Sequence, residues 1–187
     1  MASTAGFVKK HVTDLAYQTR EELGLSPFDR LDPLALAEYL AIPVRKLSEL
    51  RDENPQASDY FLTGDPGAFS AVTVFRGTER RILHNDAHSP GRQASNICHE
   101  LGHGLLLHEP TPALDGSGCR DWDQVMEDQA QWMAGALLVH ETGLISALRR
   151  GQDVVDIARR YGTSEDMVTW RINMTAAYRR ARQPVRR

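Results

Sequence analysis

In the N-terminal part of the chain, apolar residues recur every three or four positions in two segments. Residues 7–23 place their apolar side chains on one helical face, and Gly24 then favours a helix end. A second helix is predicted to begin at Pro33, because Asp32 can accept a hydrogen bond at the cap and proline misses no amide hydrogen there. This helix should end near Tyr39.

The pattern changes to that of β-strands in the middle of the chain. Residues 68–75 are rich in β-branched and aromatic side chains, and residues 80–85 favour a second strand. Turn residues 77–79 separate the two, so we predict an antiparallel hairpin. Residues 48–60 are polar and show no clear pattern.

The second half of the chain has helical spacing almost throughout. Five helices are predicted, over residues 90–108, 123–139, 143–150, 153–161 and 164–180. Strands followed by a run of helices indicate an α+β fold. We expect a core over residues 1–142, with a short antiparallel sheet, and a helical subdomain over residues 143–187 that packs on it.

Composition narrows the class of protein. A chain of 187 residues and 20.9 kDa, with 41% hydrophobic and 25% charged residues, is typical of one globular domain. The longest apolar run, Met133–Val139, is far shorter than the ~18–20 residues that span a bilayer. Two cysteines cannot form a disulfide framework, and the N-terminus lacks the features of a signal peptide. We expect a soluble, cytoplasmic protein without a membrane partner.

The net charge of −3 hides an uneven distribution along the chain. Residues 1–148 contain 12 Lys and Arg against 21 Asp and Glu, a balance of −9. Residues 149–187 contain ten arginines against four acids, a balance of +6. A basic end can bind nucleic acid or an acidic partner. Solvated helix surfaces give the same composition, and we favour that interpretation.

One short segment has a recognisable chemistry: His99-Glu100-Leu101-Gly102-His103. The two histidines are four positions apart, so on a helix they project from one face and can bind one Zn²⁺. Zinc lowers the pKa of a bound water to ~7, and Glu100 can take up its proton. This H-E-x-x-H spacing is the signature of zinc metallopeptidases. The alternative is two ordinary histidines on a helix.

A catalytic zinc usually has a third protein ligand. The segment after the motif offers four carboxylates: Asp121, Asp123, Glu127 and Asp128. Glu127 is preferred, because small and apolar residues share its helical face and suit packing against the histidine helix. The alternative for Glu127 is a surface acid near a helix N-terminus, where the helix dipole favours negative charge.

These segments together resemble the ImmA/IrrE family of metallopeptidases. The family pattern is H-E-x-x-H followed by E-x-x-A-(N/D/Q)-x-(F/L/M)-A-x-x-L-L, and residues 99–108 and 127–139 follow it. The resemblance extends over about residues 31–177. His140 stands where the family usually has a proline, which puts the end of that helix in question.

The resemblance implies a fold and a function. By position, His99, His103 and Glu127 would bind one zinc ion per chain, and Glu100 would be the general base. Family members have a small zincin-like core and cleave helix-turn-helix transcriptional repressors, in phage, mobile-element and stress-response circuits. We therefore expect a zinc-dependent endopeptidase that hydrolyses a peptide bond in one partner protein, such as a repressor.

Further residues are candidates for the substrate groove or for stabilising the transition state: Tyr161, His140, Arg92 and His108. Cys98 is expected to be a small buried residue, and Cys119 a loop thiol; both could instead regulate the zinc. Either predicted strand could bind an extended peptide along its edge.

Residues 154–172 resemble a helix-turn-helix, with Gly162 at the turn and Val168 in the second helix. They could form a structural cap, a docking surface for the repressor or a contact to DNA. Trp170 and Ile172 are typical of packing positions, so we do not expect direct DNA binding. Two alternative functions follow: a DNA-binding regulator, or a zinc-stabilised interaction module without catalysis.

Overall fold

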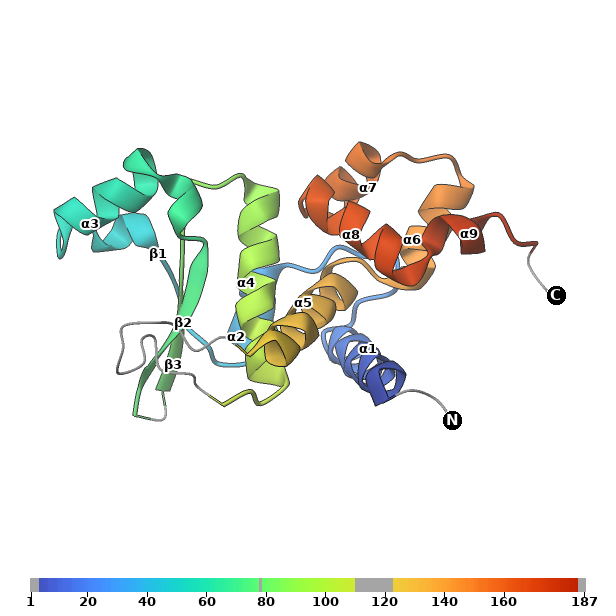
Figure 1. The fold of residues 1–187 in the computed structure, drawn as a ribbon, viewed down its shortest axis with the longest axis horizontal. Coiled ribbons are helices and arrows are strands. Elements are labelled where there is room, and N and C mark those ends of the chain that lie inside the picture. Colours follow the sequence, from blue (N-terminus) through green and yellow to red (C-terminus); the bar gives the residue numbers. More distant parts are fainter. Residues whose placement is uncertain (1–3, 78, 110–122, 185–187) are drawn as a thin grey trace.

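The computed structural model describes residues 4–77, 79–109 and 123–184. In chain order its α-helices and strands are α1 (Thr4–Glu22), α2 (Pro33–Tyr39), β1 (Val44–Lys46), α3 (Pro55–Asp59), β2 (Ala71–Arg76), β3 (Glu79–His84), α4 (Pro90–Leu105), α5 (Gln124–Leu138), α6 (Glu141–Arg149), α7 (Val154–Tyr161), α8 (Glu165–Thr175) and α9 (Ala177–Ala181). The sheet lies at one end of the molecule, α6 to α9 lie at the other, and α4 and α5 lie between them (Figure 1).

The α+β class is confirmed, and the predicted hairpin is present. β2 and β3 pair antiparallel, with Thr73 opposite Ile82. The expectation of a purely antiparallel sheet is corrected, because β1 lies parallel to β3. β1 has only three residues, too few for a strand pattern to stand out in the sequence. The strand order is β1-β3-β2, which leaves β2 at one edge.

Helices α4 and α5 pack closely against each other in the centre of the core. Leu101 on α4 and Met133 on α5 are fully buried. The close approach depends on Gly102, because a Cβ atom at this position would lie 3.1 Å from the carbonyl oxygen of Ala130. Cys98 is also fully buried here, and burial raises the pKa of its thiol. It is the small packing residue that the sequence predicts.

Two buried arginines bind the C-terminal end of α5. Arg20 on α1 donates from Nη1 to the carbonyl oxygen of Leu137 at 2.6 Å. Arg171 on α8 donates from Nε to the carbonyl oxygen of Val139 at 3.3 Å. Carbonyls at a helix C-terminus lack partners within the helix and attract cations. These bonds fasten α1 and α8 to the same end of α5.

The C-terminal helices depart from the prediction at one point. The sequence predicts a single helix over residues 164–180, but Ala176 has a left-handed φ of 51° and separates α8 from α9. The turn between α7 and α8 does fall at Gly162, where φ is 64°. One hydrophobic cluster includes side chains from both sides of residue 142. The division into domains at that residue stays a prediction.

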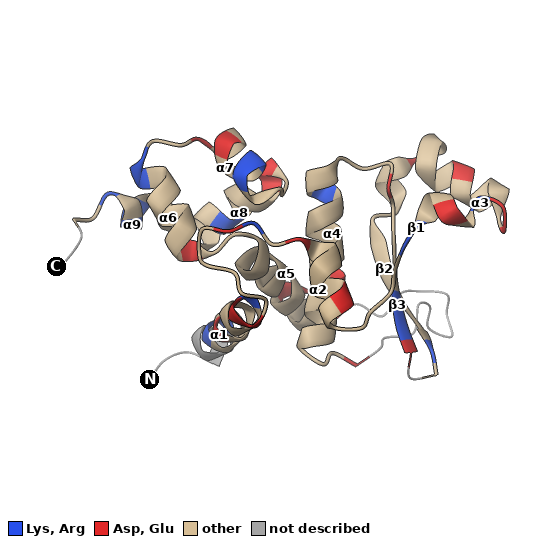
Figure 2. Cartoon of the chain, turned by 180° about the vertical axis from the view of Figure 1, so that it is seen from behind, with Lys and Arg blue, Asp and Glu red and all other residues tan. Residues whose placement is uncertain are grey.

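Figure 2 marks the Lys and Arg positions of the C-terminal helices in blue. Several of these arginines form contacts within the fold. Arg149 donates to three backbone carbonyls at the end of α9. Arg180 forms an ion pair with Glu141 at the start of α6. Arg171 is buried between α8 and α5. Part of the positive charge therefore stabilises the packing of the C-terminal helices.

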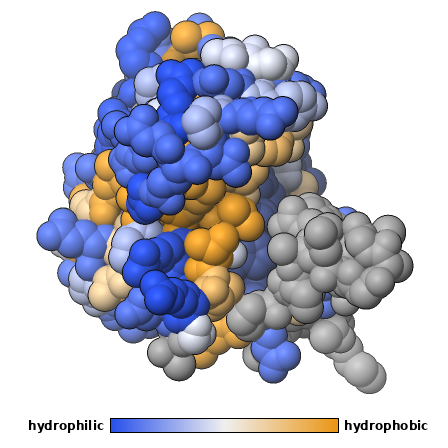
Figure 3. Space-filling view, turned by 90° about the vertical axis from the view of Figure 1, so that its left-hand side faces the viewer, coloured by the Kyte–Doolittle hydropathy of each residue, from blue (hydrophilic) through white to orange (hydrophobic). Residues whose placement is uncertain are grey.

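Figure 3 views the end of the molecule that carries the sheet, where apolar residues form a strip between hydrophilic ones. Val74 and Phe75 of β2 are among the exposed apolar side chains, with exposed fractions of 47% and 41%. Within the described residues, none of the helices has both the length and the apolar content that crossing a bilayer requires.

His140 connects α5 to α6. Its Nδ1 atom accepts a hydrogen bond from the backbone N–H of Thr142, and its ring stacks on Tyr17 with the ring centroids 3.7 Å apart. The φ of His140 is −62°, a value that proline also adopts. Helix α5 therefore ends just before His140, although the chain lacks the proline that members of the ImmA/IrrE family usually have at this position.

We predict that His140 makes stability depend on pH. Burial, with the positive charges of Arg20 and Arg171, lowers its pKa from 6.5 to about 4. The unfolded chain takes up a proton that the folded chain resists, so the free energy of unfolding falls as the pH drops from about 6.5 towards 4. Because the ring is partly exposed to solvent, we expect a loss of about 1–2 kcal/mol.

Urea unfolding at pH 7 and pH 4.5 measures this loss in the wild type and in His140→Asn. Asparagine keeps an acceptor for the backbone N–H of Thr142 and does not titrate in this range. The variant should lose less stability on acidification than the wild type. An equal loss in both proteins would contradict the prediction.

Candidate metal centre

Three side chains from two helices converge where α4 crosses α5. His99 and His103 lie one turn apart on α4, and Glu127 lies in the first turn of α5. His99 Nε2 is 3.0 Å from Glu127 Oε2 and 3.1 Å from His103 Nε2. His103 Nε2 is 3.8 Å from Glu127 Oε1. The structure therefore brings together the three residues that the sequence singles out as ligands.

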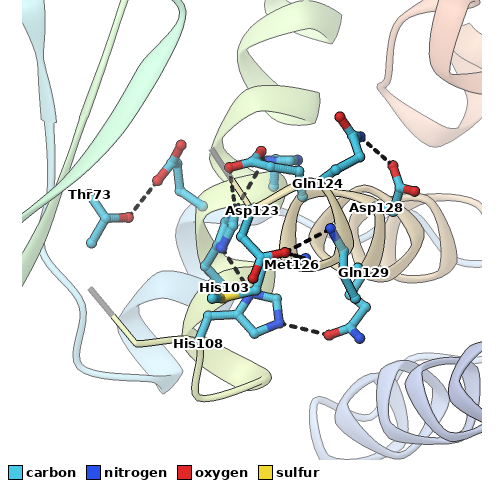
Figure 4. A network of polar contacts seen from close by, with 12 residues as sticks. Thr73, His103, His108, Asp123, Gln124, Met126, Asp128 and Gln129 are labelled. Atoms are coloured by element: carbon cyan, nitrogen blue, oxygen red, sulfur yellow. Dashed lines mark hydrogen bonds and ion pairs between the residues drawn. The ribbon is translucent and has the colours of Figure 1, made fainter. Parts of the chain in front are cut away.

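The other carboxylates that follow the motif lie elsewhere or serve another purpose. Asp123 caps α5, where its Oδ1 accepts from the backbone N–H groups of Val125 and Met126. Asp128 is exposed and accepts from Gln124 (Figure 4). Asp121 lies outside the described residues. Of the three candidate carboxylates that the structure describes, Glu127 is the one directed towards the histidines.

The donor set fits a divalent metal ion. In a tetrahedral zinc site with bonds of about 2.0–2.1 Å, ligand atoms are separated by about 3.3–3.4 Å. The two Nε2 atoms are 3.1 Å apart here, His99 Nε2 is 3.0 Å from Glu127 Oε2, and His103 Nε2 is 3.8 Å from the other oxygen, Oε1. One ligand atom from each of the three residues lies within 4.8 Å of the others. Two imidazole nitrogens and one carboxylate oxygen are also donors that suit zinc. His99, His103 and Glu127 would hold the ion and leave a fourth position for another ligand.

Glu100 lies beside these donors and is held by the sheet. Its Oε2 atom accepts a hydrogen bond of 2.6 Å from the hydroxyl of Thr73 on β2. Alternate residues of a strand face the same side, so Ala71 and Thr73 both face α4. The edge strand thus sets the position of one carboxylate oxygen, while the other oxygen is available for a proton.

An open groove of about 1390 Å³ includes His99, Glu100 and Glu127. Its polar lining outside the metal centre includes residues from the approach to β2, from α4 and from helices α7 and α8: Ser70, Arg92, Asn96, Arg159, Glu165 and Asp166. The groove therefore lies between the sheet side of the molecule and the C-terminal helices.

Two further predicted residues lie near the centre, in different roles. Arg92 lines the groove, and its Nη2 atom donates to the hydroxyl of Ser70 at 3.2 Å. His108 is not among the residues that line this groove. Its ring instead lies against His103, with the two Nδ1 atoms 2.9 Å apart (Figure 4).

The structure does not bring Tyr161 or His140 to the metal centre, which corrects the expectation that they could face the substrate. The Tyr161 side chain is fully buried, and its hydroxyl donates to the carbonyl oxygen of Pro27. His140 caps α6 and stacks on Tyr17. Cys119 lies outside the described residues.

Sequence reasoning missed two residues at the centre, Thr73 and Gln129. The alternation of the predicted strand could have placed Thr73 on the inner face, but not opposite Glu100. Gln129 lies half a turn after Glu127 and meets His108 only because of how the chain leaves α4. The two contacts join residues that are 27 and 21 positions apart and lie on different elements.

Comparison with known families agrees with this geometry. A family model described as a peptidase with an IrrE N-terminal-like domain matches residues 37–173, which is well over half of the chain. The chain belongs to the ImmA/IrrE family. It is thus a metallopeptidase of the ImmA/IrrE type, and His99, Glu100, His103 and Glu127 all lie within the matched segment. A search of curated proteins finds no significant match.

We predict that Glu127→Gln weakens zinc binding at least about 100-fold, because it removes the anionic donor of the set. Competition with a chromophoric chelator measures the affinity. Asp128→Asn is the matched control, since this neighbouring carboxylate is exposed and bonds only Gln124 among the described contacts. Equal zinc affinity in Glu127→Gln and Asp128→Asn would exclude Glu127 as a ligand.

Proposed function

We propose that this ImmA/IrrE protein is a zinc-dependent endopeptidase that cleaves one partner protein. The observation that supports this most directly is the placement of Glu100. Its carboxylate borders the same groove as His99 and Glu127 and is oriented by Thr73. A metal site that only stabilises a fold needs no such base, so the arrangement favours catalysis over a structural zinc module.

A bound zinc ion would supply acidification of water and polarisation of the peptide carbonyl. Within the chain, His99, His103 and Glu127 hold the metal, and Glu100 accepts the proton of the attacking water. The same carboxylic acid can then give this proton to the leaving amine. The hydroxyl of Thr73 bonds Glu100 Oε2 and orients the carboxylate for these steps.

The groove and the edge strand support a protein substrate. β2 is at the edge of the sheet and borders the groove at Ala71, so an extended peptide could form main-chain hydrogen bonds along it. An open groove does not require a chain end, which favours endopeptidase activity. We propose a helix-turn-helix transcriptional repressor as the substrate, on the basis of the family, with a role in transcription regulation or stress response in the cytoplasm.

Two features disfavour the alternative of a DNA-binding regulator. The turn between α7 and α8 packs on α4, where the hydroxyl of Ser95 bonds Thr163 at 3.0 Å. The second helix begins with Glu165 and Asp166, which are exposed and line the groove. In a helix-turn-helix this N-terminus would enter the major groove, where two carboxylates would face the phosphates.

We predict that Glu100→Gln retains zinc and lowers the rate of cleavage by about 10²–10⁴-fold, because glutamine cannot accept the proton. Zinc content is measured by mass spectrometry, and cleavage with a panel of helix-turn-helix repressors as substrates. Glu109→Gln is a control at an exposed acid close to the motif. Cleavage of a repressor at the wild-type rate by Glu100→Gln would exclude the proposed mechanism.

We predict a smaller effect at Thr73. Thr73→Val removes the hydroxyl that orients Glu100, so kcat should fall about tenfold while KM and zinc content stay the same. Thr73→Ser keeps the hydroxyl and should restore most of the activity. If Thr73→Val is as active as the wild type, the hydrogen bond at 2.6 Å has no role in orienting the base.

A further inference from the structure

A second feature of the centre involves residues that are not among those lining the groove. His103, His108 and Gln129 form a chain of hydrogen bonds (Figure 4). The Nδ1 atoms of the two histidines are 2.9 Å apart. His108 Nε2 is 3.0 Å from the side-chain oxygen of Gln129. The chain of bonds thus runs from α5 to the rear nitrogen of a predicted ligand.

The Gln129 oxygen sets the direction of these bonds. An amide oxygen can only accept, so His108 Nε2 must be the donor. A neutral imidazole has one N–H, which leaves His108 Nδ1 as an acceptor. His103 Nδ1 is then the donor of the second bond. Its Nε2 is left with a lone pair, directed towards His99 and Glu127.

His108 reaches this position through an unusual helix end. Leu107 has a left-handed φ of 54°, although leucine disfavours this conformation. The N–H of His108 then bonds the carbonyl oxygen of His103 at 3.0 Å, and the N–H of Leu107 bonds that of Gly104 at 3.1 Å. This pair of bonds defines a Schellman motif, in which glycine is the usual residue at the Leu107 position. The backbone folds back at this point and places His108 beside His103.

We propose that His108 and Gln129 are positioning residues that fix His103 in the tautomer required of a metal ligand. Histidine ligands commonly donate their second N–H to a carboxylate or a carbonyl oxygen, which fixes the ring and its tautomer. In this chain the acceptor is a second histidine, and Gln129 fixes its tautomer in turn. The effect on metal binding rests on the proposed function, whereas the tautomer of His103 is a property of the metal-free protein.

The tautomer is measured by ¹⁵N–¹H correlation spectra of the imidazole rings in the metal-free protein. The spectra are recorded near pH 8, above the usual histidine pKa of about 6.5. His103 should have its proton on Nδ1 in the wild type and lose this preference in His108→Phe, which keeps a ring but offers no acceptor. A wild-type His103 with its proton on Nε2 would overturn the proposal, because the bonds would then run in the opposite direction.

Zinc affinity provides the second measurement. His108→Phe and Gln129→Met should bind zinc about 10–100-fold more weakly than the wild type. His108→Asn places an amide oxygen where Nδ1 lies, so it should restore the affinity to within a few-fold of the wild type. Leu107→Gly is the control, because it suits the left-handed backbone and leaves both hydrogen bonds in place.

These measurements distinguish a positioning role of His108 from a purely structural one. They also distinguish a failure of this proposal from a failure of the proposed function. If His108→Phe and His108→Asn bind zinc equally well, His108 does not position His103. Thermal unfolding of each variant shows whether a loss of affinity accompanies a loss of fold, and the Asn variant should regain affinity at unchanged stability. A wild type that binds no zinc contradicts the proposed function, yet the tautomer of His103 still decides the direction of the hydrogen bonds.

Discussion

The contact between α4 and α5 determines whether this molecule has a metal centre at all. His99 and His103 lie on one side of it and Glu127 on the other. Gly102 permits this contact, since any side chain there would meet the backbone of Ala130. A shift of one ångström between the two helices would be comparable to the whole spread of the donor separations. The glycine inside the motif thus contributes to the chemistry through packing alone.

Local patterns predicted much of the fold. The cap at Asp32, the apolar spacing of α4 and α5 and the turn of the hairpin all act over a few residues, and the structure contains them. The break at Ala176 and the parallel pairing of β1 with β3 were not predicted. No glycine or proline marks the former, and β1 is too short to show a pattern without its partner β3.

At the metal centre too, features that depend on neighbouring residues were predictable, whereas contacts with distant parts of the chain were not. The spacing of His99 and His103, and the apolar neighbours of Glu127, are local signals that indicate which side chains face inwards. Tyr161 shows the limit of such signals, because its burial depends on the carbonyl of Pro27, 134 positions earlier in the chain. The bond from Thr73 to Glu100 likewise depends on the register of the sheet against α4.

The two arginines that bond the C-terminal end of α5 come from different parts of the chain, and this affects where the protein can be truncated. Arg20 comes from α1, which precedes the segment that the family model matches, whereas Arg171 lies just inside its end. A fragment trimmed to the matched residues would lose Arg20, one of the two arginines that bond carbonyl oxygens at the C-terminal end of α5. The packed core of this chain therefore extends beyond the region by which its family is recognised, because α1 contributes Val12 and Ala16 to it as well as Arg20.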